Sequence, residues 1–241
     1  MNKVCHFSSV HPGLDIRIYR KQCVSLARAG FDVHLVIGAT PAEVAEAAAA
    51  GVTVHPLDAA GGGRLRRMLV KAWRCYRTAR ALDADVYHFH DPELIPYGLL
   101  LSWQGKKVIV DLHEDLRAAI HSKHWIPSPL RRVIGAAARV LEHFAARRFS
   151  AVVAATPHIG SLFDKSAAQV AIIRNYPAID ELAAAPAPAH GPVERNSVCY
   201  VGSIAEIRGI RQTIQSLDMV PCKLLLAGAF DSAALRQELM G

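Results

Sequence analysis

The segment VCHFSSVHPGLDIRIYRKQCVSLARAGFDVHLVI, residues 4–37, decides the fold class. A short apolar run at Val4–Ser8 is followed by a loop, a helical stretch at Asp15–Arg28 and a second apolar run at Val33–Ile37. Runs this short, rich in valine and isoleucine and apolar on both faces, are typical of parallel strands that helices cover on both sides. The segment therefore predicts a strand–helix–strand unit of an α/β protein.

The same alternation continues along the chain at the 20–30-residue spacing of such units. Residues 1–182 are therefore predicted to form one complete, doubly wound, Rossmann-like parallel sheet. The further strand-like runs are Val52–Pro56, Val86–Phe89, Val108–Leu112, Ala151–Ala154 and Val170–Ile173. The helical stretches between them are Pro41–Ala50, Leu65–Ala81, Glu93–Trp103, Pro129–Arg148 and His158–Lys165.

Residues 183–196, AAAPAPAHGPVERN, interrupt this pattern and predict a linker. Residues 197–241 then begin a second Rossmann-like domain. Its predicted elements are a strand at Ser197–Val201, a helix at Ile207–Leu217, a strand at Cys222–Leu226 and a helix at Ser232–Met240. Two such units bury little apolar area. We therefore expect an exposed apolar edge around Leu224–Ala227, a partial domain, and a chain that does not turn over by itself.

Composition excludes several classes of protein. The chain has 241 residues, of which 51% are hydrophobic, so a disordered chain is excluded. No apolar run approaches the roughly 18 residues of a membrane-spanning helix, and the start, MNKVCHFSSV, does not resemble a secretory signal. The five cysteines are scattered without a CxxC pair, which argues against a disulfide framework and favours a reducing cytoplasm.

Positive charge is concentrated in residues 64–80, RLRRMLVKAWRCYRTAR, which hold seven Lys or Arg and no acid. Because the charge is local, no nucleic-acid partner is expected. The helix is predicted to contact an anionic membrane surface, with Trp73 at the interface, which implies a peripheral protein at the inner face of the membrane. A solvated amphipathic helix is the alternative. The stripe expected to pack on the sheet is Leu65, Met68, Leu69, Ala72, Tyr76 and Ala79.

Four loops at the carboxyl ends of predicted strands are candidate binding sites, because ligands of open parallel sheets bind there. In the first loop, Gly13 permits close approach of a ligand, and the following helix amides suit an anion. Asp15 in the same loop is a binding candidate or a helix cap. In the second loop the candidates are His90 and Asp91. His88 and His90 share one face of a strand, but no third ligand lies nearby in sequence, so no metal is predicted.

The third and fourth candidate loops carry a histidine and an arginine. His113 closes a strand and is followed by Glu114, so these two are candidates for hydrogen bonding or acid/base chemistry, or simply for a helix start. The fourth loop contains Gly202, Ser203 and Arg208, and an arginine here can reach a phosphate held by loop amides. A solvated surface arginine is the alternative.

These loops resemble one family, the retaining "group 1" (family 4) glycosyltransferases of the GT-B fold. The resemblance covers nearly the whole chain and depends on the order and spacing of several segments. They are residues 4–36 and the segments DVYHFHDPELIPYGLLL, KVIVDLHEDLRAAIHSKHWIP, ATPHI, RNYP and YVGSIAEIRGI. The resemblance implies two Rossmann-like domains, a nucleotide-sugar donor, a saccharide or lipid-linked acceptor, and no metal or other cofactor.

The resemblance also implies roles for individual residues. Gly13 matches the glycine loop that approaches the donor phosphates, His113 the histidine that contacts the donor sugar, and Arg208 the basic residue that binds the diphosphate. Ser203 stands where the family often has a second arginine. The expected reaction is sugar transfer with retention, in polysaccharide or glycolipid synthesis. The alternatives are a sugar-nucleotide 2-epimerase of the same fold and a non-catalytic nucleotide-sugar-binding subunit.

Overall fold

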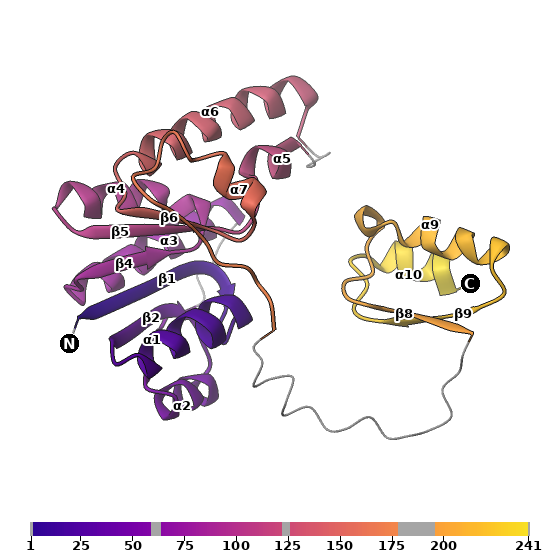
Figure 1. The fold of residues 1–241 in the computed structure, drawn as a ribbon, viewed down its shortest axis with the longest axis horizontal. Helices are drawn as coiled ribbons and strands as arrows, with labels where there is room; N and C mark the ends of the chain where they lie inside the picture. The colour runs from indigo at the N-terminus through magenta and orange to yellow at the C-terminus, as the bar shows by residue number, and fades with distance from the viewer. Residues whose placement is uncertain (1, 59–63, 122–125, 178–195, 241) are drawn as a thin grey trace. The chain divides into compact units, whose positions relative to one another are not determined.

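The structure, a computed structural model, describes residues 2–58, 64–121, 126–177 and 196–240 (Figure 1). The chain forms two compact units, residues 1–182 and 183–241, and each is described by itself. The predicted linker, apart from Asn196, lies outside the described residues. All five cysteines are free. None of the described helices combines the length and apolar character needed to cross a bilayer.

The first unit is built on a seven-stranded, fully parallel sheet in the order β3-β2-β1-β4-β5-β6-β7. The order reverses direction at β1, as in a doubly wound sheet, which confirms the predicted fold class. The strands are β1 (Lys3–Pro12), β2 (Asp32–Gly38), β3 (Val52–Pro56), β4 (Val86–Phe89), β5 (Lys107–Leu112), β6 (Ala151–Ala154) and β7 (Val170–Ile172).

Helices connect the strands and cover the sheet on both faces (Figure 1). One face packs against α3, α4 and α6, and the other packs against η1, α1 and α2 over β2 and β3. The helices are the π-helical η1 (Ile16–Cys23), α1 (Val24–Arg28), α2 (Pro41–Ala49), α3 (Arg64–Ala81), the 3-10 turn η2 (Pro92–Leu94), α4 (Ile95–Trp103), α5 (Leu116–His121), α6 (Ser128–Ala146) and α7 (Pro157–Ser161).

Helix α3 buries only part of the predicted stripe: Ala72, Tyr76 and Ala79 pack on the sheet as expected. Met68 and Leu69, expected to pack on the sheet, are 41% and 54% exposed, because the packed part of the helix begins at Ala72. The side chains of residues 64–67, among them the predicted Leu65, lie outside the described part of the chain. The buried side chains of α3 are Ala72, Cys75, Tyr76 and Ala79.

The observed helices differ from the predicted ones in helix type, in one boundary and in one additional helix. The first helix is π-helical from Ile16 to Cys23 and α-helical only afterwards. The helix predicted at 158–165 ends at Ser161. The short helix α5 was not predicted. Its six residues, 116–121, are too few to show the repeating apolar pattern by which a helix is recognised.

The second unit contains two parallel strands, β8 (Ser197–Val201) and β9 (Lys223–Ala227), with α10 (Ala233–Met240). The helix predicted at 207–217 is divided into the 3-10 turn η3 (Glu206–Arg208), α9 (Ile210–Gln215) and the turn η4 (Ser216–Met219). Gly209, with a φ of 70°, separates η3 from α9. Leu225 on β9 is 42% exposed, as expected for that strand.

Glu142 provides a test of how α6 packs. Burial, helped by the nearby charge of Asp115, raises the pKa of Glu142 to about 7. Because the pKa of Glu142 is higher in the folded than in the unfolded chain, the folded state binds the proton more tightly. The free energy of unfolding should therefore fall as the pH rises from about 4.5 to about 7. Glu142→Gln should remove this loss and be more stable than the parent at pH 8 by about 2 kcal/mol, and similar to it near pH 4.5.

Urea denaturation followed by tryptophan fluorescence at each pH measures this effect. All three tryptophans (73, 103 and 125) lie in the first unit, so the signal reports on that unit alone. Glu46→Gln, at an exposed position of α2, is the matched control. If the stability difference between the parent and Glu142→Gln does not change with pH, the raised pKa of Glu142 is contradicted.

Candidate functional site

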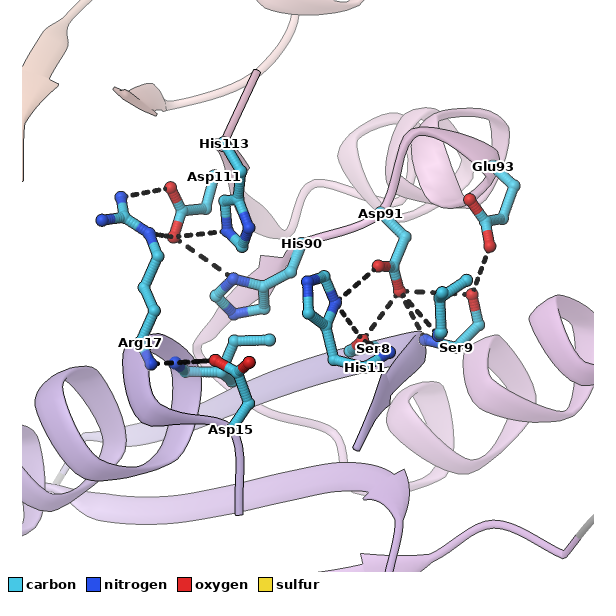
Figure 2. Close-up of polar contacts among 12 residues, drawn as sticks. Ser8, Ser9, His11, Asp15, Arg17, His90, Asp91, Glu93, Asp111 and His113 are labelled. Carbon is cyan, nitrogen blue, oxygen red and sulfur yellow. Dashed lines mark hydrogen bonds and ion pairs between the residues drawn. The ribbon is translucent and has the colours of Figure 1, made fainter. Parts of the chain in front are cut away.

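The last part of β1, residues 9–12, was expected to be loop, and a buried carboxylate just after β4, that of Asp91, holds it in place (Figure 2). Asp91 Oδ2 accepts hydrogen bonds from Ser8 Oγ at 2.8 Å and from the Ser9 amide at 2.5 Å. His11 Nδ1 lies 2.8 Å from Asp91 Oδ1. Ser9 Oγ also donates to Glu93 Oε1 at 2.9 Å. The last part of β1 is therefore held by polar contacts to Asp91, just after β4, and to Glu93 in η2.

Asp91 and His11 form an ion pair at this edge of the sheet. Burial raises the pKa of Asp91, but the contacts with His11, Ser8 and Ser9 outweigh it and hold the pKa below its ordinary value. The hydrogen bond to Asp91 in turn raises the pKa of His11. The His11 side chain remains 25% exposed, so this imidazole is partly accessible to a ligand.

A second buried carboxylate, Asp111 near the end of β5, joins η1 to the sheet. Arg17 makes a two-point contact with it, from Nε to Oδ2 at 2.9 Å and from Nη2 to Oδ1 at 2.7 Å. Gln22 Nε2 donates to Oδ2 at 2.6 Å, and Arg17 Nη1 donates to the Ile173 carbonyl at 2.6 Å. Such a bidentate pair fixes the position and the orientation of both side chains.

Two histidines complete the surroundings of Asp111 (Figure 2). His90 Nδ1 and His113 Nε2 each lie 3.3 Å from Asp111 Oδ2. Burial raises the pKa of Asp111, but the contacts with His113, His90 and Arg17 outweigh it and place the pKa far below the ordinary range. Asp111 is therefore ionised throughout the physiological pH range, and it orients both imidazole rings.

The two carboxylate clusters meet through their histidines. The ring of His113 lies 5.1 Å from that of His11 and 5.8 Å from that of His90, measured between centroids. The structure thus brings the predicted residues His90, Asp91 and His113 together at the carboxyl edge. The His113 side chain is 24% exposed, which leaves it accessible from that edge. The neighbouring Glu114 is exposed.

Gly13 and Asp15 lie in the same loop but make different contacts from those expected. A Cβ on Gly13 would lie 2.8 Å from the carboxylate of Glu43, so that side chain makes the close approach. Asp15 is the cap of η1, accepting hydrogen bonds from the amides of Arg17 and Ile18 at 2.8 and 2.9 Å. Those amides, expected to suit an anion, are occupied by Asp15.

The second unit carries the remaining predicted residues in the loop between β8 and α9. Ser203 and Arg208 are exposed, and Arg208 ends the turn η3. Gly202 has a φ of 149°, which favours glycine. Its carbonyl approaches the loop after β9 so closely that a Cβ on Gly228 would overlap it. The two strand-end loops of this unit therefore pack backbone against backbone.

Sequence reasoning missed four residues of the first unit's cluster. Asp111 lies on β5, two residues before His113, which follows the strand, so strand alternation was a usable signal for Asp111. His11 stood inside the first candidate loop, and His6 on β1 faces the same side as His88, its partner in register. Nothing local distinguished Arg17, because only the fold shows that its charge is buried against Asp111.

Removing the Asp111 charge tests the role of this cluster. Asp111→Asn leaves the buried Arg17 guanidinium without its counter-charge, and should cost about 3–5 kcal/mol of the free energy of unfolding. Asp83→Asn, which removes the exposed partner of Lys106, is the matched control and should have little effect. Urea denaturation followed by tryptophan fluorescence measures both. Equal losses in the two variants would contradict this role.

Solved structures with a similar fold include glycosyltransferases. Sucrose-phosphate synthase from Thermosynechococcus elongatus is 17% identical, with a TM-score of 0.66, and the match covers 100% of this chain and 67% of that one. Alr3699/HepE from Anabaena, solved with UDP and glucose, is 14% identical, with a TM-score of 0.63, over 100% of this chain and 64% of that one. UGT89C1 from Arabidopsis thaliana, solved with UDP-L-rhamnose, is 10% identical, with a TM-score of 0.56, over 97% and 70%.

A family model places the chain more specifically. The comparison with curated proteins gave no match. The model of the glycosyl transferase 4-like domain matches residues 16–176, which include Arg17, His90, Asp91, Asp111 and His113. Since this match covers more than half of the chain, the protein belongs to the glycosyl transferase 4-like family, and its fold is that of the GT-B glycosyltransferases.

Proposed function

We propose that the protein takes part in the transfer of a sugar, with retention, from a nucleoside-diphosphate donor to a saccharide or lipid-linked acceptor in polysaccharide or glycolipid synthesis. The observation that carries this proposal is the position of His113. This side chain is partly exposed at the carboxyl edge of the sheet, it is oriented by Asp111, and it lies within the residues that the family model matches. Ligands of open parallel sheets bind at that edge. His113 is proposed to contact the donor sugar, with His90 behind it.

The loop between β8 and α9 is proposed to hold the donor diphosphate. Transfer builds negative charge on the leaving phosphate, and a fixed cation with backbone amides stabilises such charge. Arg208 is exposed and lies in the same loop as Gly202 and Gly209. Because glycines have no side chain, a phosphate can approach the backbone of this loop closely. With front-side attack, the leaving phosphate itself accepts the proton of the acceptor, so the reaction needs no separate general base.

The surroundings of the buried carboxylates support a transferase over an epimerase. Epimerisation at C2 requires a group that takes a proton from the sugar. Asp91 and Asp111 are 3% and 1% exposed, and several donors occupy each of them. These contacts favour the carboxylates as positioning groups. A product assay distinguishes the two reactions, since an epimerase releases a free epimerised sugar whereas a transferase forms a glycoside.

Two substitutions separate the parts of the donor. Arg208→Ala should weaken binding of both UDP and UDP-glucose by about tenfold to hundredfold, because it removes a charge-assisted contact with phosphate. His113→Ala should weaken binding of UDP-glucose by about tenfold while leaving that of UDP unchanged, because His113 faces the sugar. Isothermal titration calorimetry with the 241-residue chain measures both ligands. Arg236→Ala, an exposed arginine on α10, is the control.

If Arg208→Ala binds like the control, the diphosphate assignment fails. If His113→Ala weakens UDP and UDP-glucose equally, the sugar contact fails. Incubating the chain with UDP-sugars and measuring released UDP tests the separate expectation that it does not turn over by itself.

The acceptor is proposed to be presented at an anionic membrane surface through α3. Met68, Leu69 and Trp73 are 41%, 54% and 47% exposed. The neighbouring Arg74 and Arg77 are exposed too, so apolar and cationic groups alternate along the same stretch of helix. This combination suits the interface of a bilayer that contains anionic lipids.

Charge reversal tests the membrane contact. Arg74→Glu combined with Arg77→Glu should lower binding to phosphatidylglycerol vesicles at least about tenfold, since each cation near the surface contributes about 1 kcal/mol. Lys107→Glu combined with Lys165→Glu changes the net charge equally at exposed positions away from α3, and should have a smaller effect. Vesicle sedimentation measures both. Equal binding of the parent to neutral and anionic vesicles would overturn the membrane contact.

A further inference from the structure

Three histidines gather on one face of the central strands, below the edge described above. His6 on β1 is 0% exposed, His88 on β4 is 6% exposed, and His90 just after β4 is 4% exposed. His6 and His88 are partners in the parallel register, and His88 and His90 are two residues apart. Side chains two apart on a strand share a face, and so do partners in register, so the backbone itself brings the three rings together.

The rings approach one another closely enough to share one ion. One ligand nitrogen from each histidine lies within 4.8 Å of the other two. His6 Nδ1 lies 3.1 Å from His90 Nε2. A tetrahedral zinc site, with Zn–N bonds of about 2.0–2.1 Å, places its nitrogens roughly 3.3 Å apart. The nitrogens of His6 and His90 therefore already have nearly the spacing of two ligands of such a site. Rotation of the His88 side chain would bring its nitrogen into the position of the third ligand.

The surroundings of the three rings also suit metal ligation. Asp111 Oδ2 lies 3.3 Å from His90 Nδ1, so the carboxylate favours the tautomer of His90 that carries its hydrogen on Nδ1 and leaves Nε2 as a ligand atom. His90 Nε2 shares a hydrogen bond with His6 Nδ1, and a bound ion would replace that bond. The Nε2 atoms of His6 and His88 are buried and have no hydrogen-bond partner among the described residues. Buried polar atoms without a partner are costly and uncommon in folded proteins.

The three rings are in the protonation state that a metal requires. Burial, followed by the neighbouring histidines, lowers the pKa of His6 and lowers that of His88 to about 3. Burial also lowers the pKa of His90, against the opposing effect of Asp111. These surroundings disfavour the charged imidazolium, and the neutral imidazole is the form that ligates a metal.

We propose that His6, His88 and His90 bind a late first-row divalent cation, with Zn²⁺ as the best-suited ion. Three neutral imidazoles form a ligand set that favours Zn²⁺ over Mg²⁺ or Ca²⁺, which prefer oxygen ligands. The neighbouring trio of His90, Asp111 and His113 is a weaker candidate, because Arg17 already occupies both oxygens of Asp111.

The fourth coordination position would face a cavity. A cavity of about 510 Å³ is lined by His6 and His88 together with Val4, Val86, Ile109 and Val153. A site with three protein ligands and an open position takes a water or a small ligand as its fourth group. The ion would tie β1 to β4 at the centre of the sheet and would hold His90 in place behind His113.

Titration of the metal-free 241-residue chain with ZnCl₂ tests the proposal. One Zn²⁺ should bind per chain, and at a free Zn²⁺ concentration about a hundredfold above Kd the melting temperature of the first unit should rise by about 5 °C. CoCl₂ should give the intense visible absorption of tetrahedral Co²⁺ rather than the weak bands of octahedral Co²⁺. His88→Gln and His6→Gln should each weaken Zn²⁺ binding at least about a hundredfold.

A second histidine pair provides the control. His34 on β2 and His55 on β3 have stacked rings, and His34 Nδ1 lies 2.9 Å from His55 Nε2. Among the described residues, this pair belongs to no group of three potential metal ligands. His34→Gln combined with His55→Gln should leave Zn²⁺ affinity unchanged. The proposal fails if the control weakens Zn²⁺ binding as much as His88→Gln does, or if the parent shows neither tetrahedral Co²⁺ absorption nor a rise in melting temperature. Circular dichroism with chelator present verifies that each variant folds.

Discussion

The carboxylate of Asp111 is the constraint on which the first unit depends. A charge buried in a sheet is costly unless donors surround it, and Asp111 is 1% exposed. Arg17 and Gln22 approach it from η1, and His90 and His113 approach it from the ends of β4 and β5. One group therefore fixes how the first helix lies on the sheet and how two histidines are aimed.

Asp91 performs the complementary task for the backbone. Where Asp111 orients side chains, Asp91 holds the last part of β1 through serine hydroxyls and backbone amides. The rings of His11 and His113 then meet across the two clusters. A site whose loop and rings are both fixed beforehand loses little conformational entropy when a ligand binds. Such preorganisation agrees with a transferase that relies on positioning and fixed charge.

The sequence predicted the first sheet well because each of its strands is a short apolar run between helices. The local sequence pattern was less informative where contacts between distant parts of the chain decide which side chains are buried or brought together. The exposed Met68 and Leu69 belong to a regular amphipathic period, and only the extent of the sheet shows that they project past it. Similarly, the third histidine of the buried trio lies 82 residues before His88, so spacing along the chain could not reveal it. His113 was predicted from its own loop, whereas Arg17 and Asp111 required the fold.

The order of events in folding follows from the distances along the chain that these contacts join. Ser8 bonds to Asp91 across 83 residues, and Arg17 bonds to Asp111 across 94. The first contact requires β4 to lie beside β1, and the second also requires β5 to lie beside β4. Chain segments shorter than these spans contain the individual residues without their partners. Because contacts that join distant parts of a chain form slowly, we expect the cluster at the sheet edge to form only after these strands have paired.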